Sequence, residues 1–227
     1  MSRTTYELTD GIATIRLDDG KVNALSEAML GEISAQFDRA EADEAVVILT
    51  GREGVFSAGF DLKTEGEGWP PMLVAGAKLM ERIMSFPRPV IVACGGSAIA
   101  AGSFLLLSAD YRVAADVDLK VGLNEVAIGL TLPWFAIEIA RHRLPRPWFD
   151  RCTVTGAMIG AEDGLRAGFI DEIVPSEELD ARALAVAQEL AGIDFDAHLA
   201  TKLRIRREAI DGVRDGIARI EGDGRDW

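Results

Sequence analysis

Cysteine, positive charge and long apolar runs are all scarce in this chain of 227 residues. Its two cysteines, Cys94 and Cys152, are far apart in sequence and do not match the close Cys/His spacing of a zinc site or a redox pair. The 24 basic residues are outnumbered by 37 acidic ones, and the net charge of −13 leaves no basic face for nucleic acid. We therefore predict a protein that holds no metal and binds no nucleic acid.

Membrane and secretion signals are also missing from the sequence. No stretch is apolar for long enough to span a bilayer, and the first residues lack the apolar segment of a signal peptide. We expect a cytoplasmic protein with no membrane partner. Hydrophobic residues make up 48% of the chain, which is enough to bury one sizeable core.

Strand and helix patterns alternate through the first two thirds of the chain. Two β-rich runs, residues 6–9 and 12–17, are separated by Asp10 and Gly11, a pair that favours a hairpin turn. From Ser26, a suitable N-cap, apolar residues recur with the period of a helix. Further strands are predicted at residues 45–50, 89–94 and 111–114, and further helices at residues 72–84 and from residue 102. This order indicates an α/β fold with buried, largely parallel strands.

The last part of the chain has helical periodicity and hardly any strand signal. It predicts helices at residues 176–191 and 194–219, so we divide the chain into a core, residues 1–175, and a C-terminal helical region, residues 176–227. Residues 202–208, KLRIRRE, are the one concentrated basic stretch. We interpret it as a solvated helix face, with contact to a phosphate or a neighbouring subunit as the alternative.

Two segments rich in small residues follow predicted strands. In residues 51–63, glycines allow a turn and backbone N–H groups near Phe60 can point outward, while Asp61 is interpreted as the cap of a following helix. Residues 89–104 run from a buried strand into an apolar helix whose first N–H groups have no helical partner. Two such N–H groups from separate loops would form an oxyanion hole.

Together with a third segment, these motifs carry a family resemblance. The strings FSAGFDLK at residues 56–63, GSAIAAG at 96–102 and GLNEVAIG at 122–129, preceded by KVNAL at 21–25, resemble the crotonase superfamily of enoyl-CoA hydratases and isomerases. The resemblance runs from about Tyr6 to about Leu179. It implies a spiral of ββα and βαβ turns with C-terminal helices that assemble homotrimers or hexamers. It also implies an acyl-CoA or enoyl-CoA substrate, with coenzyme A as part of the substrate and no permanently bound cofactor.

The resemblance assigns roles to individual residues. The N–H groups of the oxyanion hole fall on Phe60 and Ala101, and the catalytic carboxylate falls on Glu125. The residues expected near CoA or the acyl chain are Asn23, Ala24, Ala58, Asp61, Lys63, Phe104 and Trp134. Hydratases of the family use two glutamates, and one of these positions is Phe104, which can neither accept a proton nor hold a water.

With a single glutamate, the sequence resembles the branch of the family that moves a double bond from C3 to C2. We therefore predict a Δ3,Δ2-enoyl-CoA isomerase in which Glu125 carries a proton from C2 to C4, and we expect Phe104 and Trp134 to raise the pKa of Glu125. Two alternatives stay open. One is a hydratase in which a carboxylate such as Glu138 replaces the missing one, and the other is an acyl-CoA-binding protein without turnover in which Glu125 points away.

Overall fold

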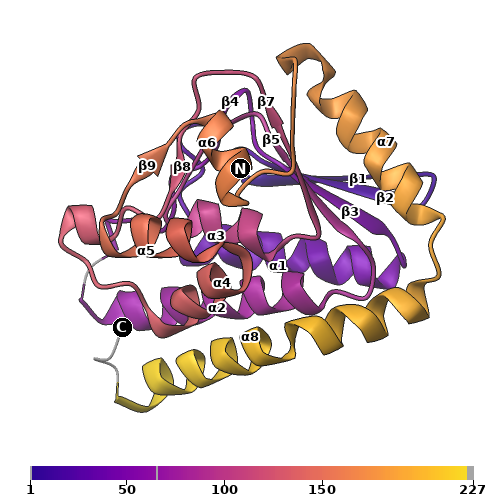
Figure 1. Cartoon of the computed structure of the whole chain (residues 1–227). Helices are drawn as coiled ribbons and strands as arrows, with labels where there is room; N and C mark the ends of the chain where they lie inside the picture. Colours follow the sequence, from indigo (N-terminus) through magenta and orange to yellow (C-terminus); the bar gives the residue numbers. More distant parts are fainter. Residues whose placement is uncertain (1, 65, 224–227) are drawn as a thin grey trace.

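The computed structural model describes residues 2–64 and 66–223 and contains two β-sheets surrounded by helices (Figure 1). The helices are α1 (Glu27–Ala42), α2 (Trp69–Ser85), α3 (Ala101–Ser108), α4 (Trp134–Arg143), α5 (Arg146–Val154), α6 (Ala161–Ala167), α7 (Leu179–Ala191) and α8 (Phe195–Asp223). The strands are β1 (Thr4–Thr9), β2 (Ile12–Leu17), β3 (Val46–Thr50), β4 (Gly54–Ser57), β5 (Val90–Cys94), β6 (Gly96–Ile99), β7 (Tyr111–Ala115), β8 (Val121–Gly122), β9 (Met158–Ile159) and β10 (Glu172–Val174). Short 3-10 helices lie at Gly66–Gly68, Val126–Ile128 and Ser176–Glu178.

The larger sheet has the strand order β1-β2-β3-β5-β7-β10. Strands β1 and β2 form the predicted antiparallel hairpin, and its turn residues Asp10 and Gly11 both have positive φ, at 50° and 75°. The remaining neighbours pair in parallel, from β2 with β3 through to β7 with β10. The predicted alternation of parallel strands and helices is confirmed. Ser26 is confirmed as the N-cap of α1, because its side chain accepts a hydrogen bond from the Met29 N–H.

Both faces of this sheet are buried, as the apolar strands predict. In β3, Val46 and Ile48 pack in a cluster with apolar residues of α7. Their neighbours Val47 and Leu49 point to the other face and belong to the main core, together with α1, α2 and α3. Side chains alternate between faces along a strand, so a sheet covered on both sides needs an unbroken apolar run.

The smaller sheet, with the order β4-β6-β8-β9, is not evident from the sequence. Its strands are two to four residues long, and β4, β6 and β8 each contain glycine, which weakens the usual strand signal. The glycine at position 96 is needed because any Cβ there would overlap the backbone of Gly54 on the neighbouring strand. By pairing β4 with β6 in parallel, this sheet brings the two segments rich in small residues side by side.

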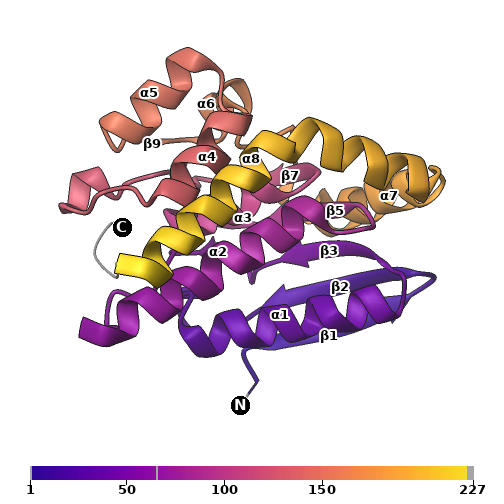
Figure 2. The same cartoon turned by 90° about the horizontal axis from the view of Figure 1, so that it is seen from below.

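The C-terminal helices fold back on the rest of the chain. Helix α8 lies across α2 and α4, and Figure 2 shows this arrangement from below. Its buried apolar residues belong to the main core: Ala209, Ile210, Val213, Ile217 and Ile220. The predicted role of this region in oligomer assembly stays a prediction.

The basic stretch on α8 is partly buried, which corrects one expectation. Lys202 and Arg206 are only 3% and 4% exposed. Both make ion pairs with the carboxylate of Asp110, at 2.7 Å from the Lys202 Nζ and 2.8 Å from an Arg206 nitrogen. They also donate to the carbonyl oxygens of Phe86 and Met84 at the end of α2, where helical partners are lacking. The interpretation as a solvated face is therefore wrong for these two residues.

Candidate active site

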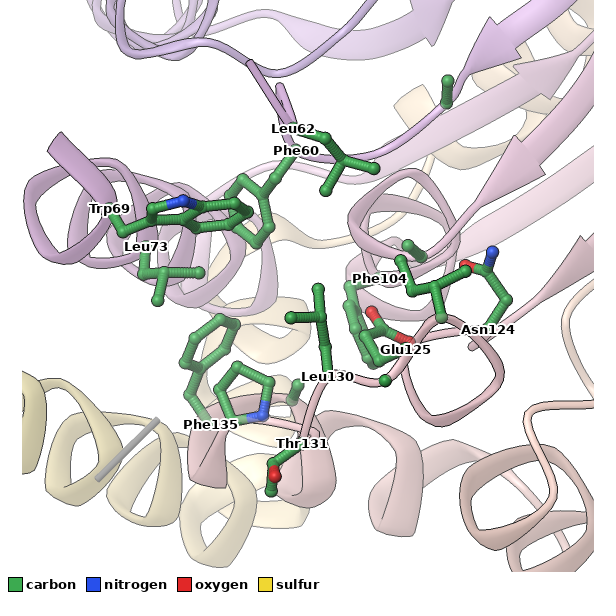
Figure 3. Close-up of a pocket in the computed structure, with 16 residues that line it drawn as sticks. Phe60, Leu62, Trp69, Leu73, Phe104, Asn124, Glu125, Leu130, Thr131 and Phe135 are labelled. Carbon is green, nitrogen blue, oxygen red and sulfur yellow. The ribbon is translucent and has the colours of Figure 1, made fainter. Parts of the chain in front are cut away.

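A cavity of about 290 Å³ lies between the end of β4, the start of α3, and helices α2 and α4 (Figure 3). Most of its wall is apolar, with large side chains from Phe60, Leu62, Trp69, Leu73, Leu130 and Phe135. Among the described residues that line it, Glu125 alone has a carboxylate. A concave apolar site with one ionisable group suits an apolar ligand whose reacting atoms exchange a proton with that group.

Glu125 follows β8 and immediately precedes the 3-10 turn at Val126–Ile128. The residue is 8% exposed, and its Oε2 is buried without a hydrogen-bond partner among the described residues. Burial raises the pKa of Glu125 to about 7, since desolvation disfavours the charged form. The predicted increase in its pKa is thereby confirmed. In Figure 3 the carboxylate lies next to the ring of Phe104, inside the cavity.

Trp134 does not contribute to this environment. Its side chain is 44% exposed, it is not among the residues that line the cavity, and the guanidinium of Arg219 lies 4.8 Å from its ring centroid. The expectation that Trp134 raises the pKa of Glu125 is therefore wrong. The next residue, Phe135, is fully buried and forms part of the cavity wall.

The backbone segments that carry Phe60 and Ala101 come together beside the cavity, which Phe60 and Ala100 line. The Leu25 N–H donates to the Gly59 carbonyl oxygen at 2.8 Å, in a parallel bridge that aligns Leu25 with Phe60. A Cβ built on Gly59 would lie 3.1 Å from the Ala101 nitrogen, so the two segments are in direct contact. Within the described part of the chain, neither the Phe60 N–H nor the Ala101 N–H donates a hydrogen bond. Both donors can therefore serve an oxygen atom of a ligand.

The segment before Ala101 is held in an unfavourable backbone conformation. Ala100 has φ 52° and ψ −121°, which a residue with a Cβ adopts only at a cost of about 1–3 kcal/mol. Its own N–H donates to the Gly122 carbonyl oxygen at 2.9 Å, and its carbonyl accepts from Ser103 and Phe104. These bonds keep the strained turn in place directly before the N-terminus of α3.

The residues expected near CoA fall in three different environments. Ala24, Asp61 and Lys63 line a separate cavity of about 350 Å³, together with Arg3 and Lys21. Ala58 and Phe104, in contrast, line the cavity that contains Glu125.

Asn23 belongs to the third environment, because it is fully buried. Its Nδ2 donates to the carbonyl oxygens of Leu17 and Phe56, and its Oδ1 accepts from the Asp19 N–H. The Asn23 side chain thus ties loops together and leaves no free group for a ligand.

Asp61 does not cap a helix, contrary to the expectation. Its Oδ1 accepts a hydrogen bond from the Lys63 N–H at 3.1 Å, which closes a local turn. Helix α2 begins only at Trp69, with Gly68 at its N-cap position. The side chain of Asp61 is therefore occupied within its own loop.

Comparison with known proteins identifies the family. A family model described as enoyl-CoA hydratase/isomerase matches residues 7–211. The chain belongs to this family. The crotonase resemblance and the α/β fold predicted from the sequence are confirmed.

Relatives within the enoyl-CoA hydratase/isomerase family carry the names of both reactions. Human mitochondrial enoyl-CoA delta isomerase 1 is 29% identical over 206 residues, which are 87% of this chain and 68% of that protein. A solved Mycobacterium tuberculosis protein is 43% identical with a TM-score of 0.94, over 97% of this chain and 98% of that one, and is named an enoyl-CoA isomerase. A second structure of that protein names it a probable enoyl-CoA hydratase. A Mycobacterium marinum enoyl-CoA hydratase is 42% identical with a TM-score of 0.95, over 98% and 99%. These names leave the reaction of this family member to be argued from its site.

Several residues of the cavity in this hydratase/isomerase family member were not singled out from the sequence. Trp69 and Leu73 stand four residues apart on α2, and Leu130 follows the turn after Glu125. For Trp69 and Leu73 the only signal was a helical apolar pattern that equally suits a closed core, and Leu130 lies in a loop that has no periodic signal. Within residues 2–64 and 66–223, no helix combines the length and apolar character needed to cross a bilayer.

Proposed function

We propose that this protein is a Δ3,Δ2-enoyl-CoA isomerase. The observation that carries the proposal is the single carboxylate of the cavity: among the described lining residues only Glu125 can exchange a proton as an acid or base, and the ring of Phe104 lies beside it. One carboxylate is sufficient for this reaction, because it removes a proton from C2 as a base and returns it to C4 as an acid. The double bond then moves from C3 to C2 into conjugation with the thioester.

The dienolate formed between these two proton transfers needs stabilisation at the thioester oxygen. We assign this role to the N–H groups of Phe60 and Ala101, which lie on two segments in direct contact and have no acceptor within the described chain. Donors already in place are favourable because no reorganisation is needed when charge develops. A lost donor of this kind costs about 10² to 10³ in rate.

Hydration is the second candidate, favoured by the names of several relatives. Activation of water by this family's route needs a second carboxylate, for which the sequence offers Glu138. Glu138 is not among the lining residues; it pairs with Arg141 at 3.4 Å and packs against Gly212 of α8. The third candidate, binding without turnover, requires Glu125 to point away from the cavity that it lines.

The CoA part of the substrate is assigned to the cavity lined by Ala24, Asp61 and Lys63. Replacing Lys63 by glutamine is expected to raise KM for a CoA thioester about fivefold, since an exposed charge contact contributes about 1 kcal/mol. The kcat should stay within twofold because Lys63 is remote from the reacting carbons. Steady-state kinetics at low ionic strength test this, and an unchanged KM would place the CoA phosphates elsewhere.

The pH dependence of activity follows from the raised pKa of Glu125. The carboxylate must be ionised to remove the C2 proton, and its pKa is about 7. We expect kcat/KM to rise with pH through about 7 and to level off above it. A profile measured between pH 5 and 9 that is already level at pH 5 would contradict this expectation.

The reaction itself is tested by supplying purified protein with two substrates. A trans-3-enoyl-CoA should gain the ultraviolet absorbance of a conjugated thioester, whereas a trans-2-enoyl-CoA should keep its absorbance. Loss of absorbance from the second substrate would indicate hydration and overturn the isomerase assignment.

We retain, as further predictions, a cytoplasmic location, a CoA-binding core in residues 1–175, and a homotrimer or hexamer assembled through residues 176–227.

A further inference from the structure

Helix α2 contains a buried glycine, Gly76, in its interior. Glycine in the middle of a helix destabilises it by about 0.5–1 kcal/mol relative to alanine, so a packing reason is expected. A Cβ built on Gly76 would lie 2.5 Å from Cε1 and 2.6 Å from Cζ of Phe60. The ring of Phe60 therefore occupies the space that any larger residue would need.

The contact joins the proposed oxyanion hole to the wall of the acyl cavity. Trp69 and Leu73 precede Gly76 by seven and three residues, so the three positions share one face of α2. Figure 3 shows Phe60 beside Trp69 and Leu73, on the side of the cavity opposite Glu125. Phe60 thus supplies a backbone donor and, through its ring, a contact with the helix that lines the acyl site.

We propose that Gly76 is a positioning residue for catalysis. By receiving the ring of Phe60, it fixes the backbone of residue 60 and holds the N–H at the position of the thioester oxygen. The preceding residues are held by backbone hydrogen bonds: Leu25 N–H donates to the Gly59 carbonyl oxygen, and Ala58 N–H donates to the Val22 carbonyl oxygen. The Gly59 N–H donates to the Ser57 hydroxyl. The contact with Gly76 acts on residue 60 itself, through its ring. The inference rests on the proposed function, because it takes the Phe60 N–H as an oxyanion donor.

The first test variant is Gly76→Ala. Ordinary contact needs at least about 3.4 Å, so the added methyl displaces the ring by about 1 Å. A misplacement of about 1 Å can cost up to ~10²-fold in rate. We expect kcat for a trans-3-enoyl-CoA to fall at least tenfold while KM changes less than threefold, since the CoA contacts are elsewhere.

Acetoacetyl-CoA serves as a probe of the oxyanion hole that needs no turnover. Donors at the thioester oxygen favour its enolate, which has its own ultraviolet band, and the band is measured per mole of folded protein. We expect a clear band with the wild type and a band at least several-fold weaker with Gly76→Ala. Absence of the band in the wild type would overturn the proposed function and this inference together. An undiminished band and kcat in Gly76→Ala would overturn the inference alone.

Phe60→Leu separates positioning from a general packing defect. The side chain of leucine ends at Cδ, and Cδ1 of Phe60 is 3.8 Å from the Cβ built on Gly76, so leucine leaves room for a methyl group. Phe60→Leu alone should weaken the enolate band, because the ring no longer fixes residue 60. Adding Gly76→Ala to it should then have almost no further effect.

Two results with these variants would overturn the inference. One is a tenfold loss from Gly76→Ala that persists in the Phe60→Leu background, and the other is full kcat and a full band in Phe60→Leu. Full kcat and a full band in Phe60→Leu would overturn the inference even if Gly76→Ala fails to fold. Gly31→Ala is the matched control, since this helical glycine of α1 has nothing within 4 Å of an added Cβ and should keep both the band and kcat.

Discussion

Replacing Glu125 by glutamine is expected to lower kcat for a trans-3-enoyl-CoA by about 10² to 10⁴-fold, because a positioned acid or base contributes this much. Glutamine has a similar shape but cannot take up the C2 proton. KM should change little, since the proposed mechanism places Glu125 at the reacting carbons and not at the CoA moiety. The increase in ultraviolet absorbance of the conjugated thioester measures the rate directly.

Glu138→Gln is the matched control for this variant. Glu138 lies on α4 close in sequence to Glu125, but it pairs with Arg141 and does not line the cavity. Its replacement should leave kcat within about twofold. If Glu125→Gln kept most of its activity, or if Glu138→Gln lost most of it, the assignment of Glu125 as the proton carrier would be wrong.

Glu125→Gln is also expected to change the stability of the protein, in a direction that the pKa of Glu125 sets. The pKa of Glu125 is raised to about 7 in the folded protein, so folding favours the neutral carboxyl and stability falls as pH rises above the ordinary glutamate range. Glutamine cannot ionise and escapes this cost. Glu125→Gln should therefore melt at a higher temperature than the wild type at pH 8, and the difference should nearly vanish at pH 4.

Most of the larger sheet was predictable from sequence because its signals are local. Strands β3 and β5 are unbroken apolar runs that are each followed by a glycine, and the Asp10-Gly11 pair specifies the hairpin through two consecutive positive φ angles. The three-residue strand β10 at the edge of this sheet was not predicted. The motif at residues 122–129 likewise pointed to Glu125, although not to the strand β8 before it. These features depend on neighbours in the chain and hardly on tertiary packing.

The smaller sheet and the cavity wall depend on contacts between distant segments. A strand of two residues such as β8 has no period to detect, and Gly96 is explained only once Gly54 is seen against it. The same holds for Gly76, whose partner Phe60 lies sixteen residues earlier in the chain. Sequence motifs pointed to the proposed reactive groups, but they could not reveal what fixes these groups in place.

The burial of basic residues on α8 was not predicted, for a related reason. Lys202 and Arg206 stand one helical turn apart in a charged segment, which is typical of a solvated face. Their burial is tolerated because Asp110 and the carbonyl groups at the ends of α2 and α3 provide acceptors. No local pattern in α8 indicates that these acceptors, about a hundred residues away, face it.

Asp110→Asn is therefore expected to destabilise the protein by about 3–5 kcal/mol, because it leaves two buried cations without their counter-charge. The Asp110 carboxylate accepts from Lys202, Arg206 and the Val90 N–H, and asparagine preserves its size while removing its charge. The melting temperature should fall by roughly 10 °C at pH 7. Glu221→Gln is the control: it breaks the Lys78–Glu221 pair, also 2.8 Å long but more than half exposed on both sides. Exposed pairs contribute at most about 1 kcal/mol, so this variant should melt near the wild type.

The pH dependence distinguishes loss of charge from a mere packing defect in Asp110→Asn. Burial opposes ionisation of Asp110, but Lys202 and Arg206 beside it hold its pKa below the ordinary value. A carboxyl with a lowered folded pKa contributes stability above its unfolded pKa of about 3.9 and loses it as pH falls through the folded value. The difference in stability between wild type and Asp110→Asn should therefore be largest at pH 7 and should narrow only below about pH 4. Helix α3 runs from Ala101 at the proposed oxyanion hole to Ser108 near this cluster. We expect an Asp110→Asn variant that still folds to keep its enolate band. Loss of the band would mean that the cluster also sets the position of the Ala101 N–H.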